Sequence, residues 1–252
     1  ALAYREKVPI LGRGSGTNLT GGTIPVRGGI VVHFSRMNRI LEIDIPNRTV
    51  TAEPGVITLD LQTEVLKKGF VYQPDPASQK VSTIGGNIAE NSGGPHCLKY
   101  GVTSNHIQGL ELVLNDGTVI RTGGKSWDNP GYDIKGLFVG CEGTLGLVTK
   151  ASLKLERAPE AVKTMLAIYE TIEDGANTVS AIIAEGIIPA CEETTLSADA
   201  IVIAGELACH WMAQRTPPWT ARPGRPSFWM RKPNDNWPLH GGITGTKPRF
   251  IG

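Results

Sequence analysis

The sequence predicts an α+β fold in which one large domain is followed by the beginning of a second. Short apolar runs between turn residues indicate strands, and amphipathic segments long enough for a helix are few. Three glycine-rich segments interrupt this pattern before Pro159. After Pro159 a new strand and a new amphipathic helix begin, which marks the second domain.

Composition narrows the class of protein. The chain has 252 residues and a formal net charge of +1, and this near-neutral balance argues against binding to nucleic acid or to a charged membrane surface. No run approaches the roughly 18 consecutive apolar residues of a transmembrane segment, and residues 1–7 lack the basic-then-apolar order of a signal peptide. The four cysteines form no CxxC pair, which indicates reduced thiols and a cytoplasmic protein.

The first part of the chain consists mainly of strands. Residues 40–45 alternate apolar and acidic side chains, as a half-buried strand does, and residues 49–52 return as the hairpin partner. Thr58 is expected to cap a helix that runs through Lys68 and ends at Gly69. The other strands expected here cover residues 8–11, 30–34 and 70–72.

The following part adds short helices and a hairpin. Residues 83–90 are expected to form a helix whose N-terminal amides face a ligand. Asn115-Asp116-Gly117 is a turn signal between two strands. The elements expected here are the strands 107–114, 118–121 and 148–155, and a helix over 134–139 capped by Asp133.

The C-terminal third differs from the rest of the chain in composition and in residue pattern. A strand over residues 165–169 and a helix capped by Thr171 and ended by Gly186 begin the second domain, for which we expect residues 161–205. Residues 206–252 cluster Trp, Pro and Arg without helical or strand periodicity. This tail is interpreted as a disordered Pro-rich segment, as a recognition segment with aromatic anchors, or, preferably, as sequence never selected to fold, such as a changed reading frame produces.

The stretch from Pro74 to Gly94 is dense in Gly, Ser, Thr and Asn and has no run of charge. Glycine permits positive φ and close backbone approach, and such a segment suits a phosphate-bearing ligand held by peptide N–H groups. Taken alone, the stretch could equally be a long surface loop. The glycine segments at 12–22 and 140–148 favour the ligand-binding interpretation.

The first glycine segment matches neither of two familiar phosphate-binding motifs. For GxGxxG, the last position is Thr17 or Leu19, depending on the starting glycine. The P-loop pattern fails at Gly124-Lys125-Ser126, because Val119 stands where its first glycine is required. What remains is a strand followed by a tight turn rich in N–H donors.

The glycine motifs together resemble the flavin-binding domain of the vanillyl-alcohol-oxidase-type (PCMH-type) FAD flavoproteins. Within that family they are most similar to the FAD-linked subunit of glycolate oxidase and to D-lactate dehydrogenases. The resemblance covers residues 1–189 and implies a PCMH-type FAD-binding domain of two α+β subdomains over 1–160, shortened at its N-terminus, and the start of a substrate (cap) domain. The motifs are residues 12–22, 75–78 with 83–87, 91–94 with 99–101, and 142–146.

The resemblance also implies a set of FAD-binding residues. Some relatives attach FAD covalently through a histidine in the first loop, and Thr17 stands at that position here, so the resemblance implies non-covalent FAD. The first loop would hold the pyrophosphate, the middle motifs would lie along the flavin and the diphosphate, and the last motif would contact the far end, with the adenine. The implied residues are Arg13, Gly14, Ser15, Gly16, Thr17, Asn18, Pro74, Asp75, Ser78, Gly85, Gly86, Asn91, Gly93, Gly94, Tyr100, Gly101, Glu142, Gly143, Gly146 and Val148.

The function implied by the resemblance is oxidation of a small 2-hydroxy acid, of the glycolate or D-lactate type, by hydride transfer to the flavin. Electrons would pass on to an acceptor or to a partner redox subunit. Two alternatives stay open: a non-catalytic FAD-binding fragment or subunit completed by a partner chain, and an enolpyruvyl reductase of the cell-wall type. Catalytic residues are not assigned, because the family's substrate segment is not found after Pro189, and the histidines show no metal-ligand spacing.

Overall fold

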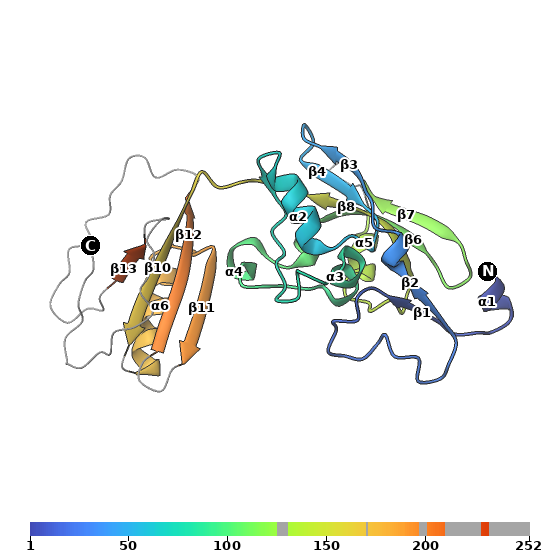
Figure 1. Cartoon of the computed structure of the whole chain (residues 1–252), viewed down its shortest axis with the longest axis horizontal. Coiled ribbons are helices and arrows are strands. Elements are labelled where there is room, and N and C mark those ends of the chain that lie inside the picture. Colours follow the sequence, from blue (N-terminus) through green and yellow to red (C-terminus); the bar gives the residue numbers. More distant parts are fainter. Residues whose placement is uncertain (125–130, 170, 197–200, 210–227, 232–252) are drawn as a thin grey trace. The chain divides into compact units, whose positions relative to one another are not determined.

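The computed structural model describes residues 1–124, 131–169, 171–196, 201–209 and 228–231. The chain divides into two compact units, Ala1–Ala158 and Pro159–Gly252 (Figure 1). Each unit combines strands and helices, which confirms the predicted α+β class. Among the described residues, no helix combines the length and the apolar character needed to cross a membrane.

A five-stranded sheet forms the centre of the first unit. Every neighbouring pair in it is antiparallel, and two of the pairs, β3 with β4 and β6 with β7, are joined by hairpins. The hairpin between its last two strands turns at Asp116 and Gly117, where Gly117 has a φ of 90° and the Asp116 carboxylate accepts hydrogen bonds from the backbone and the hydroxyl of Thr118. The strands, in spatial order, are β3 (Ile40–Asp44), β4 (Thr49–Ala52), β8 (Leu147–Lys154), β6 (Ile107–Val113) and β7 (Val119–Gly123).

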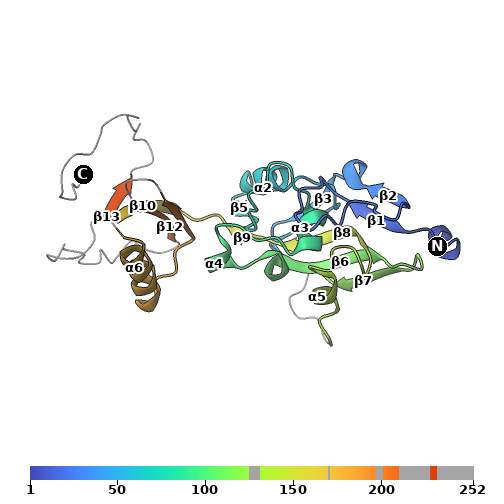
Figure 2. The same ribbon diagram turned by 90° about the horizontal axis from the view of Figure 1, so that it is seen from below.

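Two helices, α2 (Thr58–Leu66) and α3 (Ile84–Glu90), pack against this sheet (Figure 2). Leu61 and Val65 from α2 and Ile84 and Ile88 from α3 are fully buried, together with Leu153 of β8. Each such side chain contributes about 1.5–3 kcal/mol on burial. The core therefore fixes α3 on the sheet, and α3 borders the cavity described below.

A separate two-stranded parallel sheet carries the first glycine segment. Strands β1 (Ile10–Arg13) and β2 (Ile30–His33) pair in register, Ile10 with Ile30 and Arg13 with His33. The loop between them begins directly after Arg13, so the end of β1 delivers the glycines to the cavity. The remaining elements of the first unit are α1 (Leu2–Arg5), η1 (Phe34–Arg36), β5 (Phe70–Val71), α4 (Cys97–Tyr100), η2 (Thr103–His106), α5 (Ile134–Phe138) and β9 (Glu156–Arg157).

The capping predictions have mixed outcomes. Asp133 caps α5 and Thr171 caps the helix of the second unit, as predicted, each accepting a backbone N–H at 3.2 Å. Thr83, for which no cap was predicted, caps α3 in the same way. The prediction for Thr58 is wrong, because α2 begins at Thr58 and Ile57 occupies the N-cap position. The Thr58 hydroxyl instead accepts a hydrogen bond from the Asn87 amide at 2.7 Å, so a contact with α3 takes the place of the cap.

The second unit contains an antiparallel sheet in the order β11-β12-β10-β13 and the helix α6 (Ile172–Ala184). Val179 of this helix packs on Ala167 and Tyr169. The tail predicted over residues 206–252 contains a strand at residues 228–231 that its irregular sequence does not suggest. Residues 210–227 and 232–252, for which the sequence allows three interpretations, lie outside the described ranges. The strands are β10 (Ala161–Tyr169), β11 (Cys191–Leu196), β12 (Ile201–Cys209) and β13 (Phe228–Arg231).

His106 is buried at the start of β6. Its Nε2 lies 3.0 Å from the Tyr100 carbonyl oxygen, and its ring meets that of Tyr72 edge-on at 6.0 Å between centroids. Its Nδ1 is enclosed without a hydrogen-bond partner among the described residues. Burial lowers the pKa of His106, because a charged imidazole is poorly solvated there.

We expect acidification to destabilise the first unit through His106. The folded-state pKa lies below the unfolded value of about 6.5, so the unfolded chain binds the proton more readily. This contribution to the unfolding free energy is complete above the unfolded pKa and is lost as the pH falls toward the lowered one. Urea unfolding, followed by circular dichroism between about pH 7.5 and about pH 5, should give a flatter profile for His106→Gln than for the unchanged chain. Parallel profiles would contradict this assignment.

Candidate functional site

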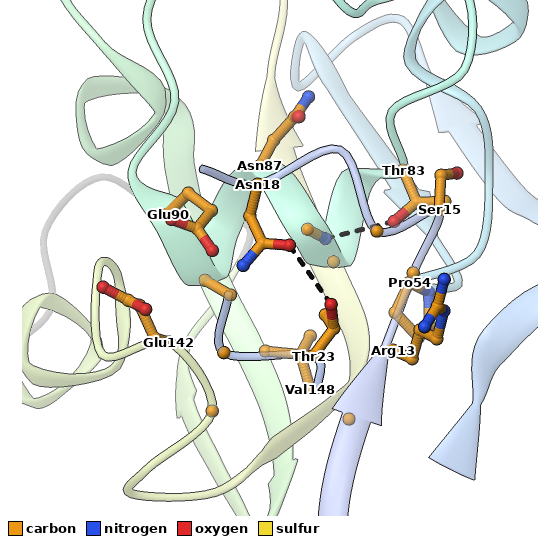
Figure 3. Close-up of a pocket in the computed structure, with 18 of the residues that line it drawn as sticks. Arg13, Ser15, Asn18, Thr23, Pro54, Thr83, Asn87, Glu90, Glu142 and Val148 are labelled. Carbon is orange, nitrogen blue, oxygen red and sulfur yellow. Dashed lines mark hydrogen bonds between the residues drawn. The ribbon is translucent and has the colours of Figure 1, made fainter. Parts of the chain in front are cut away.

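A cavity of about 310 Å³ lies in the first unit, where three glycine-rich segments meet (Figure 3). One wall is the loop that follows β1, a second is α3 with its cap Thr83, and a third is the segment between α5 and β8. The predicted residues that line it are Arg13, Gly14, Ser15, Gly16, Thr17, Asn18, Ser78, Gly85, Gly86, Glu142, Gly143, Gly146 and Val148.

The other predicted residues lie outside this lining. Asp75 pairs with His96, whose Nδ1 is 2.5 Å from the Asp75 carboxylate, and the rings of His96 and Tyr100 are 6.3 Å apart. Asn91 ends α3 with a φ of 49°, and its side chain accepts the Ser104 N–H at 2.9 Å. These contacts join the residues to other parts of the first unit, and their flavin-binding role stays a prediction. They are Pro74, Asp75, Asn91, Gly93, Gly94, Tyr100 and Gly101.

The first amides of α3 are occupied by the protein itself. The Ile84 N–H donates to the Val56 carbonyl at 2.9 Å, and the Gly85 N–H donates to the Pro54 carbonyl at 2.8 Å. The Gly86 N–H donates to the Thr83 hydroxyl at 3.2 Å. The prediction that these amides face a ligand is therefore wrong, because each already has an acceptor.

The loop after β1 has the opposite property. Within the described part of the chain, the backbone N–H groups from Gly14 to Asn18 have no hydrogen-bond acceptor. Side chains hold the loop instead: the Ser15 hydroxyl donates to the Val81 carbonyl, and the Asn18 amide lies 3.1 Å from the Thr20 hydroxyl. The cavity is thus bordered by a run of unpaired N–H donors beside the Arg13 guanidinium, an arrangement that suits an anion.

Two glycines are required by close backbone approach. A Cβ on Gly14 would collide with the Thr83 hydroxyl, and a Cβ on Gly85 would lie 2.6 Å from the Pro54 Cβ. The loop and the Pro54 turn therefore rest directly on the first turn of α3. Any larger residue would push these walls apart.

Two carboxylates border the opposite side of the cavity. In Figure 3, Glu90 and Glu142 lie at one side, and Arg13 and Ser15 lie at the other. The Glu142 N–H donates to the Ala89 carbonyl at 2.9 Å, and the Glu142 carboxylate accepts the Thr20 hydroxyl at 2.8 Å. Burial raises the pKa of Glu90, and the nearby charge of Glu142 raises it further.

Several lining residues were not predicted from the sequence. Pro54 and Phe34 reach the cavity only because the chain folds back on α3, and nothing near them in sequence indicates this. Glu90 directly precedes the Asn91-Ser92-Gly93-Gly94 motif, which could have drawn attention to it. The main additional lining residues are Phe34, Pro54, Thr83, Asn87, Glu90, Ser92, Phe138 and Cys141.

Comparisons with known proteins agree with this site. Residues 1–123 match the family described as FAD binding domain. The glycolate oxidase subunit GlcD of Bacillus subtilis (strain 168) is 60% identical over 193 residues, which cover 76% of this chain and 41% of that protein. The subunit GlcD of Escherichia coli (strain K12) is 40% identical over 189 residues, and these cover 75% and 38% of the two chains.

Other relatives are named for a different activity. The D-lactate dehydrogenase of Anaerostipes hadrus is 37% identical over 179 residues, covering 71% of this chain and 38% of that protein. The chain thus spans about two fifths of the length of these curated relatives. A solved structure of alkyldihydroxyacetonephosphate synthase matches with a TM-score of 0.72 and 23% identity, covering 81% of this chain and 46% of that one, which shows the shared fold.

The cavity fits the FAD of this family. FAD carries a pyrophosphate, and the unpaired amides that begin at Gly14, beside Arg13, supply donors for it. The close approach of Gly14 to Thr83 and of Gly85 to Pro54 leaves this space clear of side chains. The match over residues 1–123 shows a FAD binding domain, and its cofactor is FAD.

Proposed function

We propose that this chain is the FAD-binding part of an oxidoreductase that oxidises a 2-hydroxy acid of the glycolate or D-lactate type. The observation that carries the proposal is the run of unpaired amides from Gly14 to Asn18 at the edge of a glycine-walled cavity. The relatives named glycolate oxidase subunit and D-lactate dehydrogenase support the substrate class. Enolpyruvyl reduction is less well supported, because none of these relatives carries that name.

The chain's own task is to bind and orient the cofactor. In this proposal the first loop and Arg13 hold the pyrophosphate, and the Glu142 to Val148 segment contacts the adenine end. Ser78, Gly85 and Gly86 lie along the diphosphate and the flavin, and the wall formed by Asp75 and residues 91–101 continues along the flavin. Bound FAD supplies an acceptor for the hydride that leaves the hydroxyl-bearing carbon of the substrate.

The proposal also implies the partners of the protein, because the hydride needs a donor and the electrons need an acceptor. A small 2-hydroxy acid is the substrate, and an acceptor or a redox subunit takes the electrons onward. We place the protein in the cytoplasm, which the free thiols of Cys97 and Cys141 support. Fractionation of cells that produce the natural protein tests this placement.

A second candidate is a FAD-binding subunit that is completed by another chain. It is favoured by the lining of the cavity, where the titratable side chains are Glu90, Glu142, Arg13 and Cys141, and no histidine or lysine is among them. Such a protein binds FAD and leaves 2-hydroxy acids unchanged on its own.

Replacing Gly85 by Ala is expected to weaken FAD binding about tenfold or more. The new Cβ would lie 2.6 Å from the Pro54 Cβ, so α3 and the Pro54 turn must separate. Isothermal titration of the apoprotein with FAD measures the dissociation constant. Gly124→Ala is the matched control, because a Cβ there meets nothing within 4 Å, and it should retain the original affinity. Equal dissociation constants for FAD in the two variants would argue against a role of the Gly85–Pro54 contact in FAD binding.

Acid precipitation of the loaded chain should leave the flavin in the supernatant. Among the described residues no histidine lines the cavity, and Thr17 supplies no flavin-linking side chain. The absorption spectra of pellet and supernatant give the result. Flavin that stays with the pellet would show a covalent link.

Anaerobic mixing of the FAD-loaded chain with glycolate or D-lactate is expected to bleach the flavin absorption. L-lactate, the enantiomer of D-lactate, tests whether the site distinguishes the two enantiomers. Loss of the oxidised flavin bands with either acid supports the oxidoreductase. Tight FAD uptake with no bleaching by any of the three acids would favour the second candidate.

Replacing Glu142 by Gln should lower the pKa of Glu90 toward its ordinary value. The Glu142 charge contributes to the raised pKa of Glu90, so its removal makes ionisation of Glu90 easier. Carbon-13 NMR titration of the glutamate carboxyls measures the shift. Glu64→Gln, which removes an exposed carboxylate on α2, is the control and should leave the pKa of Glu90 in place. An unchanged pKa of Glu90 in Glu142→Gln would show that the Glu142 charge does not raise the pKa of Glu90.

A further inference from the structure

Arg39 and Glu53 are joined by a compact set of hydrogen bonds. The Glu53 side chain is only 7% exposed, and its Oε1 accepts from the Arg39 Nη2 at 2.9 Å. Its Oε2 accepts from the Arg39 backbone N–H at 2.9 Å and from the Arg39 Nε at 3.3 Å. In return, the Glu53 N–H donates to the Arg39 carbonyl at 3.0 Å. The two residues therefore hold one another in a single geometry.

The turn that follows Glu53 is attached on two sides. On one side, the Gly55 N–H donates to the Met37 carbonyl at 2.8 Å, and a Cβ on Gly55 would collide with the Phe34 carbonyl. On the other side, the Pro54 carbonyl accepts the Gly85 N–H of α3. The turn is thus a spacer between η1 and α3.

This spacer forms part of the cavity. Pro54 and Phe34 both line it, and in Figure 3 Pro54 lies beside Arg13. A Cβ on Gly12 would lie 3.3 Å from the Phe34 ring, so Phe34 also supports the end of β1. The width of the cavity next to the unpaired amides depends on where the Pro54 turn stands.

The charge of Glu53 is needed for the pair. Arg39 holds the pKa of Glu53 below its ordinary value, mainly by its hydrogen bonds. The carboxylate is therefore ionised at neutral pH, and a neutral amide in its place would present N–H groups to the Arg39 donors. Glu53 directly precedes the Pro54 turn, and neither residue of the pair lines the cavity, so the effect of the pair on a ligand passes through Pro54.

We propose that Glu53 and Arg39 act as positioning residues for FAD, by holding the Pro54 turn at the distance from β1 and α3 that the cofactor requires. The inference rests on the proposed cofactor role of the cavity. It adds a function for an ion pair that touches no ligand, and it assigns the affinity for FAD in part to residues outside the lining.

The test compares FAD affinity with thermal stability in matched variants of the full chain. Glu53→Gln removes the charge from the pair. Glu111→Gln removes a similarly enclosed carboxylate, 13% exposed, which pairs with Lys150 and Arg121 on the central sheet and lies outside the cavity lining. Isothermal titration gives the dissociation constant for FAD, and circular dichroism gives the melting temperature of each apoprotein.

We expect Glu53→Gln to weaken FAD binding about tenfold, while Glu111→Gln retains the original affinity even where its melting temperature falls as far. Arg39→Ala should weaken binding in the same direction, and Arg39→Lys should restore part of the loss. Because the two residues act through one contact, the double variant Glu53→Gln/Arg39→Ala should bind FAD no more weakly than the weaker single variant.

Three outcomes would overturn the proposal. The first is an unchanged affinity for FAD in both Glu53→Gln and Arg39→Ala. The second is a loss of affinity that follows the melting temperature equally in the Glu53 and Glu111 variants. The third is additive losses in the double variant. If Glu53→Gln does not fold, the exposed Arg39 provides the comparison, because its side chain is 74% exposed. Failure of the unchanged chain to bind FAD would instead overturn the cofactor role itself.

Discussion

The cavity depends on one constraint, the internal bonding of the first turn of α3. Its amides are taken by the carbonyls of Pro54 and Val56 and by the Thr83 hydroxyl. A short helix bonded in this way offers little to an anion, although its position at the cavity wall would suggest otherwise. Unpaired donors are found instead in the loop from Gly14 to Asn18. The internal bonding of the helix thus leaves the binding of a phosphate-bearing ligand to other segments of the cavity lining.

The distribution of charge in the cavity follows from the same arrangement. The donor loop ends β1 together with Arg13, whereas Glu90 and Glu142 are brought together because the last turn of α3 accepts the Glu142 N–H. The Arg13 guanidinium therefore stands apart from the two carboxylates, and the loop runs from Arg13 toward them, where its Thr20 hydroxyl donates to Glu142. A molecule with an anionic centre and a part rich in hydroxyl and amine donors matches this polarity, and a dinucleotide such as FAD has both.

Local signals in the sequence were enough to predict most elements and the glycine segments. Asp133 stands before a short apolar run and caps it, and the Asp116-Gly117 turn follows directly from its residue types. Contacts between distant segments were not accessible in this way. Thr58 does not cap α2 as expected, and its hydroxyl accepts a hydrogen bond from Asn87 instead. Pro54 lines the cavity because it packs closely against Gly85. Tertiary contacts outweigh local preferences at such positions.

The attachment of α3 at both ends has a consequence for the exchange of the cofactor. At its first turn the helix is bonded to the Pro54 turn, and at its last turn the Ile88 and Ala89 carbonyls accept the N–H groups of Gly140 and Glu142. Neither the Pro54 turn nor the segment that contains Gly140 and Glu142 can move outward by itself unless its backbone hydrogen bonds to α3 break. Entry and exit then require a local opening that involves several segments at once, and such cooperative openings are infrequent. A bound flavin would accordingly leave slowly, and the rate of departure would be set by the protein's own fluctuations more than by the strength of any single contact.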